Sequence, residues 1–196
     1  MVDVYAKIDA SIKSGLKILG SGKDPVKTIG SATDAYRKAE AELGGIGTPV
    51  IGTTDHHKYQ LAEKRIEGLK LEIRGYARQS MTERVDNVYK TIRNNDYGIP
   101  KLRTRGLNVL LDPVTSSGIS ESVSGKTEKY RKESEGYVKT VITELDRVGL
   151  KEADDDALKS ELNRKLAAAK KTLERQKKDY EGAARADAIR KASKRR

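Results

Sequence analysis

Both histidines of the chain stand side by side after an aspartate, as Asp55-His56-His57. These side chains are the ones that metal-dependent phosphoester hydrolysis uses. Successive residues of a helix point about 100° apart, so three neighbours on a helix do not converge on one ion. Helical zinc pairs need a spacing of four, but Gln60 and Leu61 occupy the positions four residues on. The spacing therefore argues against a metal site.

A helix start explains the same residues better. In phosphoesterases that carry this tripeptide, it ends a strand and further acidic and histidine motifs complete the metal pair, whereas this chain has no other histidine. Thr53, Thr54 or Asp55 fits as a helix N-cap, with the acid near the positive helix end. We predict a capped helix here and no bound metal.

A second chemical candidate is Gly125-Lys126-Thr127, which matches the end of a nucleotide-binding P-loop. The full pattern needs glycine at position 120, which is Ser120. The chain after Lys126 also has helical periodicity, which leaves no strands for the parallel sheet of a P-loop fold. Cysteine is absent, and a Ser-His-Asp triad would need one of the same two histidines. We predict no enzymatic activity, no catalytic residues, no cofactor and no small-molecule substrate.

The charge of the chain points instead to a polyanion. The net charge is +11, and residues 150–196 contribute +6 of it, from 15 Lys and Arg against nine Asp and Glu. The final nine residues, "AIRKASKRR", hold five bases and no acid. A basic end of this kind favours sequence-independent contact with phosphates. The predicted nucleic-acid contacts there are Arg185, Arg190, Lys191, Lys194, Arg195 and Arg196.

Two further basic segments are weaker candidates. The predicted loop "PKLRTRG" adds Lys101, Arg103 and Arg105 to the nucleic-acid contacts. Between Lys170 and Asp187, acids are interleaved with the bases, and we interpret that mixed stretch as a solvated helix face.

Apolar periodicity predicts an all-α fold of about five helices, two of them long and resembling coiled coils. The first long helix covers 55–94, and its stripe runs from Ala62 to Tyr76, slips in phase and resumes from Met81 to Ile92. The second long helix opens at Asp154-Asp155-Asp156 and has its stripe from Leu158 to Ala184. Asp24-Pro25 and Gly44-Gly45 delimit an earlier helix, and the helix that begins near Thr127 ends at Gly149.

The middle of the chain, residues 94–120, lacks such a pattern, and we predict it to be long and irregular. The predicted organisation is an N-terminal helical region at 1–94, a connecting segment at 95–125 and a C-terminal helical hairpin with a basic tail at 126–196. Large aliphatic residues make up only about a fifth of the chain, so narrow helical stripes are expected to be buried partly against other subunits. Two apolar loops, 44–52 and 107–114, favour the same view. The predicted subunit contacts are Val50, Ile51, Leu110 and Leu111.

The sequence contains no apolar run of 18 residues and no secretory signal, so we expect a protein of a virion or of the cytoplasm that is neither transmembrane nor secreted. The expected function is that of a non-enzymatic structural protein of a virus or phage particle, a coat, internal or ejection-type component. Its expected partners are copies of itself or other structural subunits, and nucleic acid through its basic end, with no role for a membrane. The alternatives are a cellular coiled-coil adaptor and a nucleoid-associated DNA-binding protein.

Overall fold

The computed structural model describes residues 3–105 and 113–193, with side chains at 3–93, 125–178, 182, 185, 189 and 193. These residues form five α-helices and no strand, which confirms the predicted all-α class. The helices are α1 (Val4–Ser21), α2 (Pro25–Gly44), α3 (Thr54–Arg105), α4 (Pro113–Arg147) and α5 (Ala153–Ser193). Over the same described residues, no helix is apolar enough over a sufficient length to cross a membrane.

The helices contribute to two compact units. Unit 1 contains residues 1–81 and 139–159, and unit 2 contains residues 82–138 and 160–196. Unit 1 therefore holds α1, α2, the first part of α3, the end of α4 and the start of α5, while unit 2 holds the remaining parts of the last three helices.

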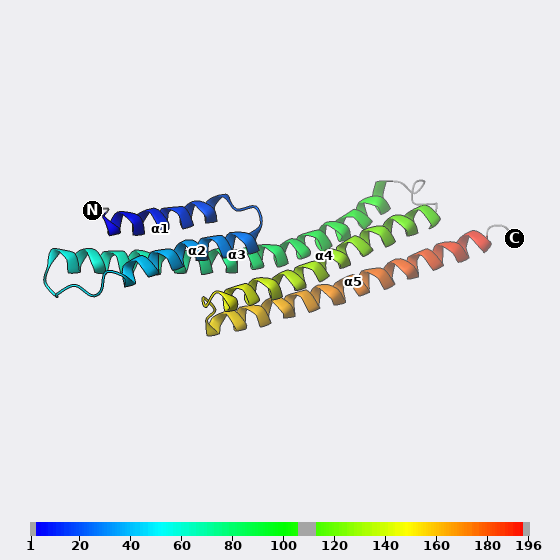
Figure 1. The fold of residues 1–196 in the computed structure, drawn as a ribbon. Helices are drawn as coiled ribbons and strands as arrows, with labels where there is room; N and C mark the ends of the chain where they lie inside the picture. The colour runs from blue at the N-terminus through cyan, green and yellow to red at the C-terminus, as the bar shows by residue number, and fades with distance from the viewer. Residues whose placement is uncertain (1–2, 106–112, 194–196) are drawn as a thin grey trace. The chain divides into compact units, whose positions relative to one another are not determined.

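In unit 1, α1 and α2 form an antiparallel hairpin (Figure 1). Gly15 brings α1 against α3, because a Cβ at this position would lie 3.0 Å from the Cδ atoms of Leu69. Asp24 caps α2 by accepting from the amide of Val26 at 3.1 Å, as its pairing with Pro25 predicts. The core of the unit is aliphatic and includes Ile8, Ile29, Leu69, Ile73, Val141 and Leu145.

The end of α4 explains how the chain turns in unit 1. Gly149 has a φ of +73°, which favours glycine, and its amide donates to Asp146 O. The amide of Leu150 donates to Leu145 O at 2.9 Å, and both leucine side chains are buried. These are the two hydrogen bonds of a Schellman motif, and the two leucines occupy the positions of its apolar pair. The predicted helix end at Gly149 is confirmed to within two residues.

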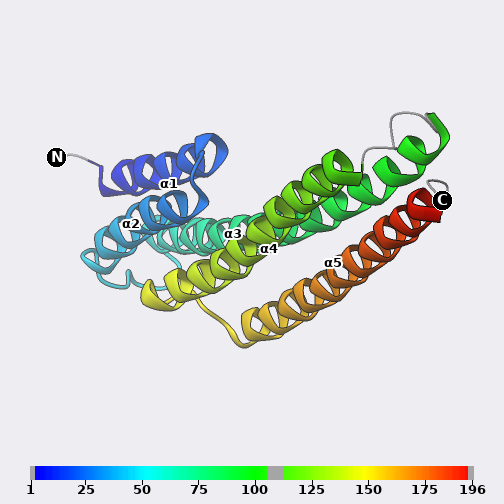
Figure 2. The ribbon, with the colours of Figure 1, turned by 90° about the vertical axis from the view of Figure 1, so that its right-hand side faces the viewer.

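In unit 2, segments of α3, α4 and α5 pack along one another (Figure 2). The hydroxyl of Tyr89 donates to Lys165 O at 2.6 Å and joins α3 to α5. The apolar core is made of Val85, Val88, Ile92, Val138, Leu162, Leu166, Ala169 and Leu173. On the N-terminal side of Val138, the inner face of α4 is polar, since Thr127, Arg131 and Ser134 are buried there.

The buried stripe of α3 differs in one detail from the predicted one. Ala77 is fully buried, while Tyr76 is only half-buried and its hydroxyl donates to Gly22 O at 3.5 Å. The stripe therefore passes through Ile73, Ala77, Met81 and Val85 in equal steps of four. The expected slip in phase is this local run of four-residue steps. In a heptad pattern, such an extra step of four is called a stutter.

The middle of the chain is more helical than predicted. Residues 95–105 belong to α3 and residues 113–125 to α4, while 106–112 lie outside the described residues. Gly98, Pro100 and the serines after Pro113 all have low helix propensity, which is why this stretch has no helical signature in the sequence. Propensity is a weak guide, and the expectation of an irregular 94–120 is wrong for these two parts. The start of α4 is correspondingly at Pro113 and not near Thr127.

Candidate functional site

Thr53 fixes the conformation of the segment that contains the two histidines. Its hydroxyl oxygen accepts from the amide of His56 at 3.2 Å, and its carbonyl oxygen accepts from the amide of His57 at 3.2 Å. Asp55 lies in the first turn of α3, where a carboxylate stabilises the helix. The predicted helix start is confirmed, with Thr53 as the cap. Among the described residues, no three His, Cys, Asp or Glu side chains come together in a way that would hold a metal ion.

The P-loop-like tripeptide also lies on a helix. Gly125, Lys126 and Thr127 belong to the interior of α4, with helix on both sides. The side chain of Thr127 is buried. This geometry confirms that the segment is helical and provides none of the loop amides that cradle a nucleotide.

The loop between α2 and α3 presents two predicted contact residues to solvent. Val50 is 77% exposed and Ile51 is 83% exposed. The amide of Thr53 donates to Val50 O at 3.3 Å, and the Thr53 hydroxyl donates to the same oxygen at 2.8 Å. Gly52 between them has a φ of +90°, as the third position of a type II turn requires. The turn at 50–53 is therefore an ordered structure that holds Ile51 outward at its corner.

The other predicted contact residues, Leu110 and Leu111, lie outside the described residues. The basic residues Lys101, Arg103 and Arg105 were predicted to lie on a loop, but the structure places them in the last turns of α3. Pro100 and Gly106 have low helix propensity, so this helical stretch resembles a loop in the sequence.

The basic C-terminal residues are only partly described. Arg185 is exposed on α5. Arg190 and Lys191 lie in the same helix, where only their backbone is described. Lys194, Arg195 and Arg196 lie outside the described residues. The structure thus extends the helix to within three residues of the end of the basic tail.

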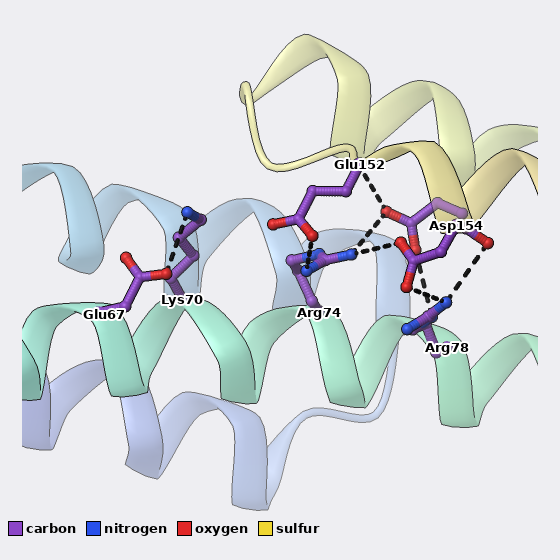
Figure 3. Close-up of polar contacts among 7 residues, drawn as sticks. Glu67, Lys70, Arg74, Arg78, Glu152 and Asp154 are labelled. Atoms are coloured by element: carbon purple, nitrogen blue, oxygen red, sulfur yellow. Dashed lines mark hydrogen bonds and ion pairs between the residues drawn. The ribbon is translucent and has the colours of Figure 1, made fainter.

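Sequence reasoning missed a cluster of ion pairs in unit 1 (Figure 3). Arg74 on α3 pairs with Glu152 at 2.6 Å, with Asp154 at 2.9 Å and with Asp155 at 3.3 Å. One turn further along α3, Arg78 pairs with Asp154 at 2.8 Å and with Asp155 at 3.2 Å. The Arg74 side chain is 7% exposed and that of Asp155 is fully buried. We call these five residues the Arg74 cluster.

Asp155 connects this cluster to the start of α5. Its Oδ2 accepts from the amide of Glu152 at 2.9 Å, as the acidic residue of a capping box does. Burial alone would lower the pKa of Arg74, but Asp155, Glu152 and Asp154 together raise it above its usual value. The run of three aspartates signalled a helix start in the sequence, but nothing in it identified Arg74 and Arg78 as the partners.

A second polar cluster lies in unit 2 around Arg84 of α3. Its guanidinium carbon lies 4.6 Å from the ring centre of Tyr130 and 5.6 Å from that of Tyr137, both on α4. Its Nε donates to the hydroxyl of Ser134 at 3.3 Å. These contacts connect two helices of unit 2.

Comparison with known proteins gives no relative. No family model, no curated protein and no solved structure matches the chain.

Proposed function

We propose that the chain is a non-enzymatic assembly protein that associates with copies of itself or with other structural subunits. One observation carries this proposal, namely the ordered turn that holds Val50 and Ile51 at 77% and 83% exposure. Single exposed apolar residues are common. Here two adjacent ones lie on a turn that is closed by two hydrogen bonds, and they form a small apolar surface patch of defined conformation. Burying such side chains stabilises a contact by about 1.5–3 kcal/mol each.

The same proposal assigns nucleic acid to the C-terminal end of α5. The bases of this end, which include the exposed Arg185, contact the phosphate backbone without reading sequence. The setting that we propose is a virus or phage particle, where a structural subunit has to meet both its neighbours and a genome. The lean aliphatic content and the long helices support this setting. A cellular coiled-coil adaptor and a nucleoid-associated protein are the competing settings.

The assembly part is tested by Ile51→Asp, with light scattering at micromolar concentration. A charge at the corner of the turn should shift the assembly toward smaller species, and circular dichroism should show unchanged helix content because the Ile51 side chain is largely exposed. Leu71→Asp is the matched control, since Leu71 is an exposed leucine (56%) of the same unit on α3. We expect this control to assemble like the wild type.

Two results would overturn the assembly proposal. One is a wild-type protein that stays monomeric and melts cooperatively. The other is an equal loss of assembly in the Ile51 and Leu71 variants, which would indicate general apolar association.

A further inference from the structure

The charges of α5 are mixed in sequence but sorted on its surface. Arg164, Lys171, Lys178 and Arg185 repeat every seven residues, and all four are exposed. Residues seven apart on a helix lie on one face and drift by only about 20° per repeat. Arg175, also exposed, falls four residues after Lys171 on the same face. We call these five cations, all of which belong to unit 2, the basic stripe.

The basic stripe lies opposite the buried face of α5. At 100° per residue, its centre is about 180° from the line of Leu162, Leu166, Ala169 and Leu173, which is buried in unit 2. Two small exposed residues, Ala167 and Gly182, lie between cations of the stripe. A rigid partner can therefore approach the helix closely along the whole stripe.

Two acids near the stripe pair with lysines that do not belong to it. Glu161 pairs with Lys165 at 3.1 Å, and Glu174 pairs with Lys170 at 3.8 Å. Both lysines lie outside the stripe, at about 100° or more from its centre. These two acids are thus partly neutralised by lysines that lie off the stripe.

We propose that a nucleic-acid duplex lies along the basic stripe, so that the contact extends well beyond the C-terminal tail. This inference deepens the proposed function and rests on it. From Arg164 to Arg185 the stripe is about 30 Å long, at 1.5 Å per residue. A duplex of that length carries about 18 phosphates, since it has one charge per 1.7 Å of axis. The contact is to the backbone and is independent of base sequence.

Two other polyanions fit the stripe less well. An anionic membrane holds a helix through an inserted apolar face, but the apolar face of α5 in unit 2 is already buried. Single-stranded nucleic acid is held by bases stacked on aromatic side chains, and none of the stripe positions from Arg164 to Arg185 is aromatic. A helix face that presents five exposed cations suits the duplex.

The test uses two double variants of the full chain that differ only in the helix face they change. Lys171→Gln with Lys178→Gln removes two charges from the stripe, and Lys170→Gln with Lys177→Gln removes two from a neighbouring face. All four lysines are exposed, and each pair is seven residues apart. Binding to duplex DNA is measured by fluorescence anisotropy between 50 and 200 mM salt. Circular dichroism verifies that the helix content is kept.

We expect the stripe variant to lower the salt slope by up to about 1.8, at 0.9 for each lost phosphate contact. Over that salt range, the wild type would then lose roughly tenfold more affinity than the stripe variant. The off-stripe variant should bind with nearly the wild-type slope. Equal losses in the two variants would overturn the inference, because net charge and not the face would then control binding.

Deleting residues 188–196 separates the inference from the proposed function. If this deletion weakens binding while the stripe variant behaves like the wild type, the tail is the nucleic-acid contact and the stripe is not. If neither change matters, both proposals fail. Tighter binding of the wild type to a single strand, or to vesicles with anionic lipid, would also overturn the duplex assignment.

Discussion

Each of the two units contains an arginine whose side chain is only 7% exposed, but the two are held in different ways. In unit 1, Arg74 of α3 reaches acids at the start of α5, about 80 residues away in sequence, and one of them, Asp155, is fully buried. In unit 2, Arg131 pairs with Glu128 at 2.8 Å and with Glu135 at 3.1 Å, both on its own helix.

The difference separates a tertiary contact from a local one. The Arg74 cluster fixes where α5 begins relative to α3 within unit 1, because the buried carboxylate has to keep a cationic partner. The pairs of Arg131 satisfy the arginine without specifying any other helix, and their acids are partly exposed. A buried charge therefore determines the fold only where its partner comes from another element.

The largest expected effect is that of Arg74→Ala. The substitution removes the arginine that pairs with Glu152, and of the two arginines of the cluster it leaves Asp155 only Arg78. Removing one partner of a buried pair costs about 3–5 kcal/mol, so we expect a loss of this size in the free energy of unfolding, measured with urea. Arg131→Ala is the matched control, with an expected loss of roughly 1 kcal/mol from helical pairs whose acids reach solvent, plus some packing.

Comparable losses in the two variants would contradict this comparison, because the origin of the partner would then make no difference. Arg74→Met sharpens the test further. It keeps most of the side-chain volume, so any loss that it shares with Arg74→Ala comes from the charge and not from packing.

A smaller effect is expected for Arg84→Ala in unit 2. Here a partly exposed arginine joins α3 to α4 through two tyrosine rings, the Ser134 hydroxyl and an exposed ion pair with Glu133 at 3.8 Å. Cation–π contacts at exposed to partly desolvated sites contribute about 0.5–2 kcal/mol, and we expect a loss in that range. Arg93→Ala on the same helix is the control, since Arg93 is exposed and an ordinary surface substitution changes stability by less than about 0.5 kcal/mol.

The loss in the free energy of unfolding for Arg84→Ala is to be compared with the losses for Arg74→Ala and Arg131→Ala. If Arg84→Ala behaved like Arg93→Ala, the tyrosine contacts would add nothing to stability. The link between α3 and α4 in unit 2 would then depend on contacts other than those of Arg84.

The sequence predicts the fold well where a signal is local. Asp24 with Pro25, Thr53 before the histidines, Gly149 and the aspartates at 154–156 each satisfy backbone groups within a few residues, so their patterns can be read directly. The helical extensions at 95–105 and 113–125 could not be predicted, because their glycine, proline and serine content opposes helix formation.

Contacts between distant elements carry no such pattern. Nothing near Arg74 in sequence distinguishes it from Arg78 or Arg84, and the three have different surroundings in the structure. The exposed turn at Val50 and Ile51 was visible in sequence because it is apolar and lies between glycines. The sorting of charge on α5 could also have been found, because it follows from helical geometry, but the order of residues along the chain conceals it.

The smallest expected effect concerns acid, and it compares one carboxylate from each unit. In unit 1, burial would raise the pKa of Asp154, but the hydrogen bond and charge of Arg78, with those of Arg74, lower it below the usual 3.8. In unit 2, the hydrogen bond from Arg131 lowers the pKa of Glu128 below the usual 4.5. A carboxylate whose pKa is lowered on folding stabilises the protein above its unfolded pKa, and this stabilisation is lost as the pH falls through the folded pKa.

We therefore expect these two groups to leave the urea midpoint nearly constant between pH 7 and pH 5. At pH values below about 4.5, the midpoint should decrease. Arg78→Gln should reduce the part of this fall that belongs to Asp154, and Arg131→Gln the part that belongs to Glu128. The Glu128 pair lies within one helix and its acid reaches solvent, so its contribution is about 0.2–1 kcal/mol. Urea titrations at pH 7, 5, 4 and 3 measure both. An acid dependence that is unchanged in both variants would mean that other carboxylates dominate it. A dependence that disappears only in Arg78→Gln would place the acid sensitivity in unit 1, where the arginine reaches across helices.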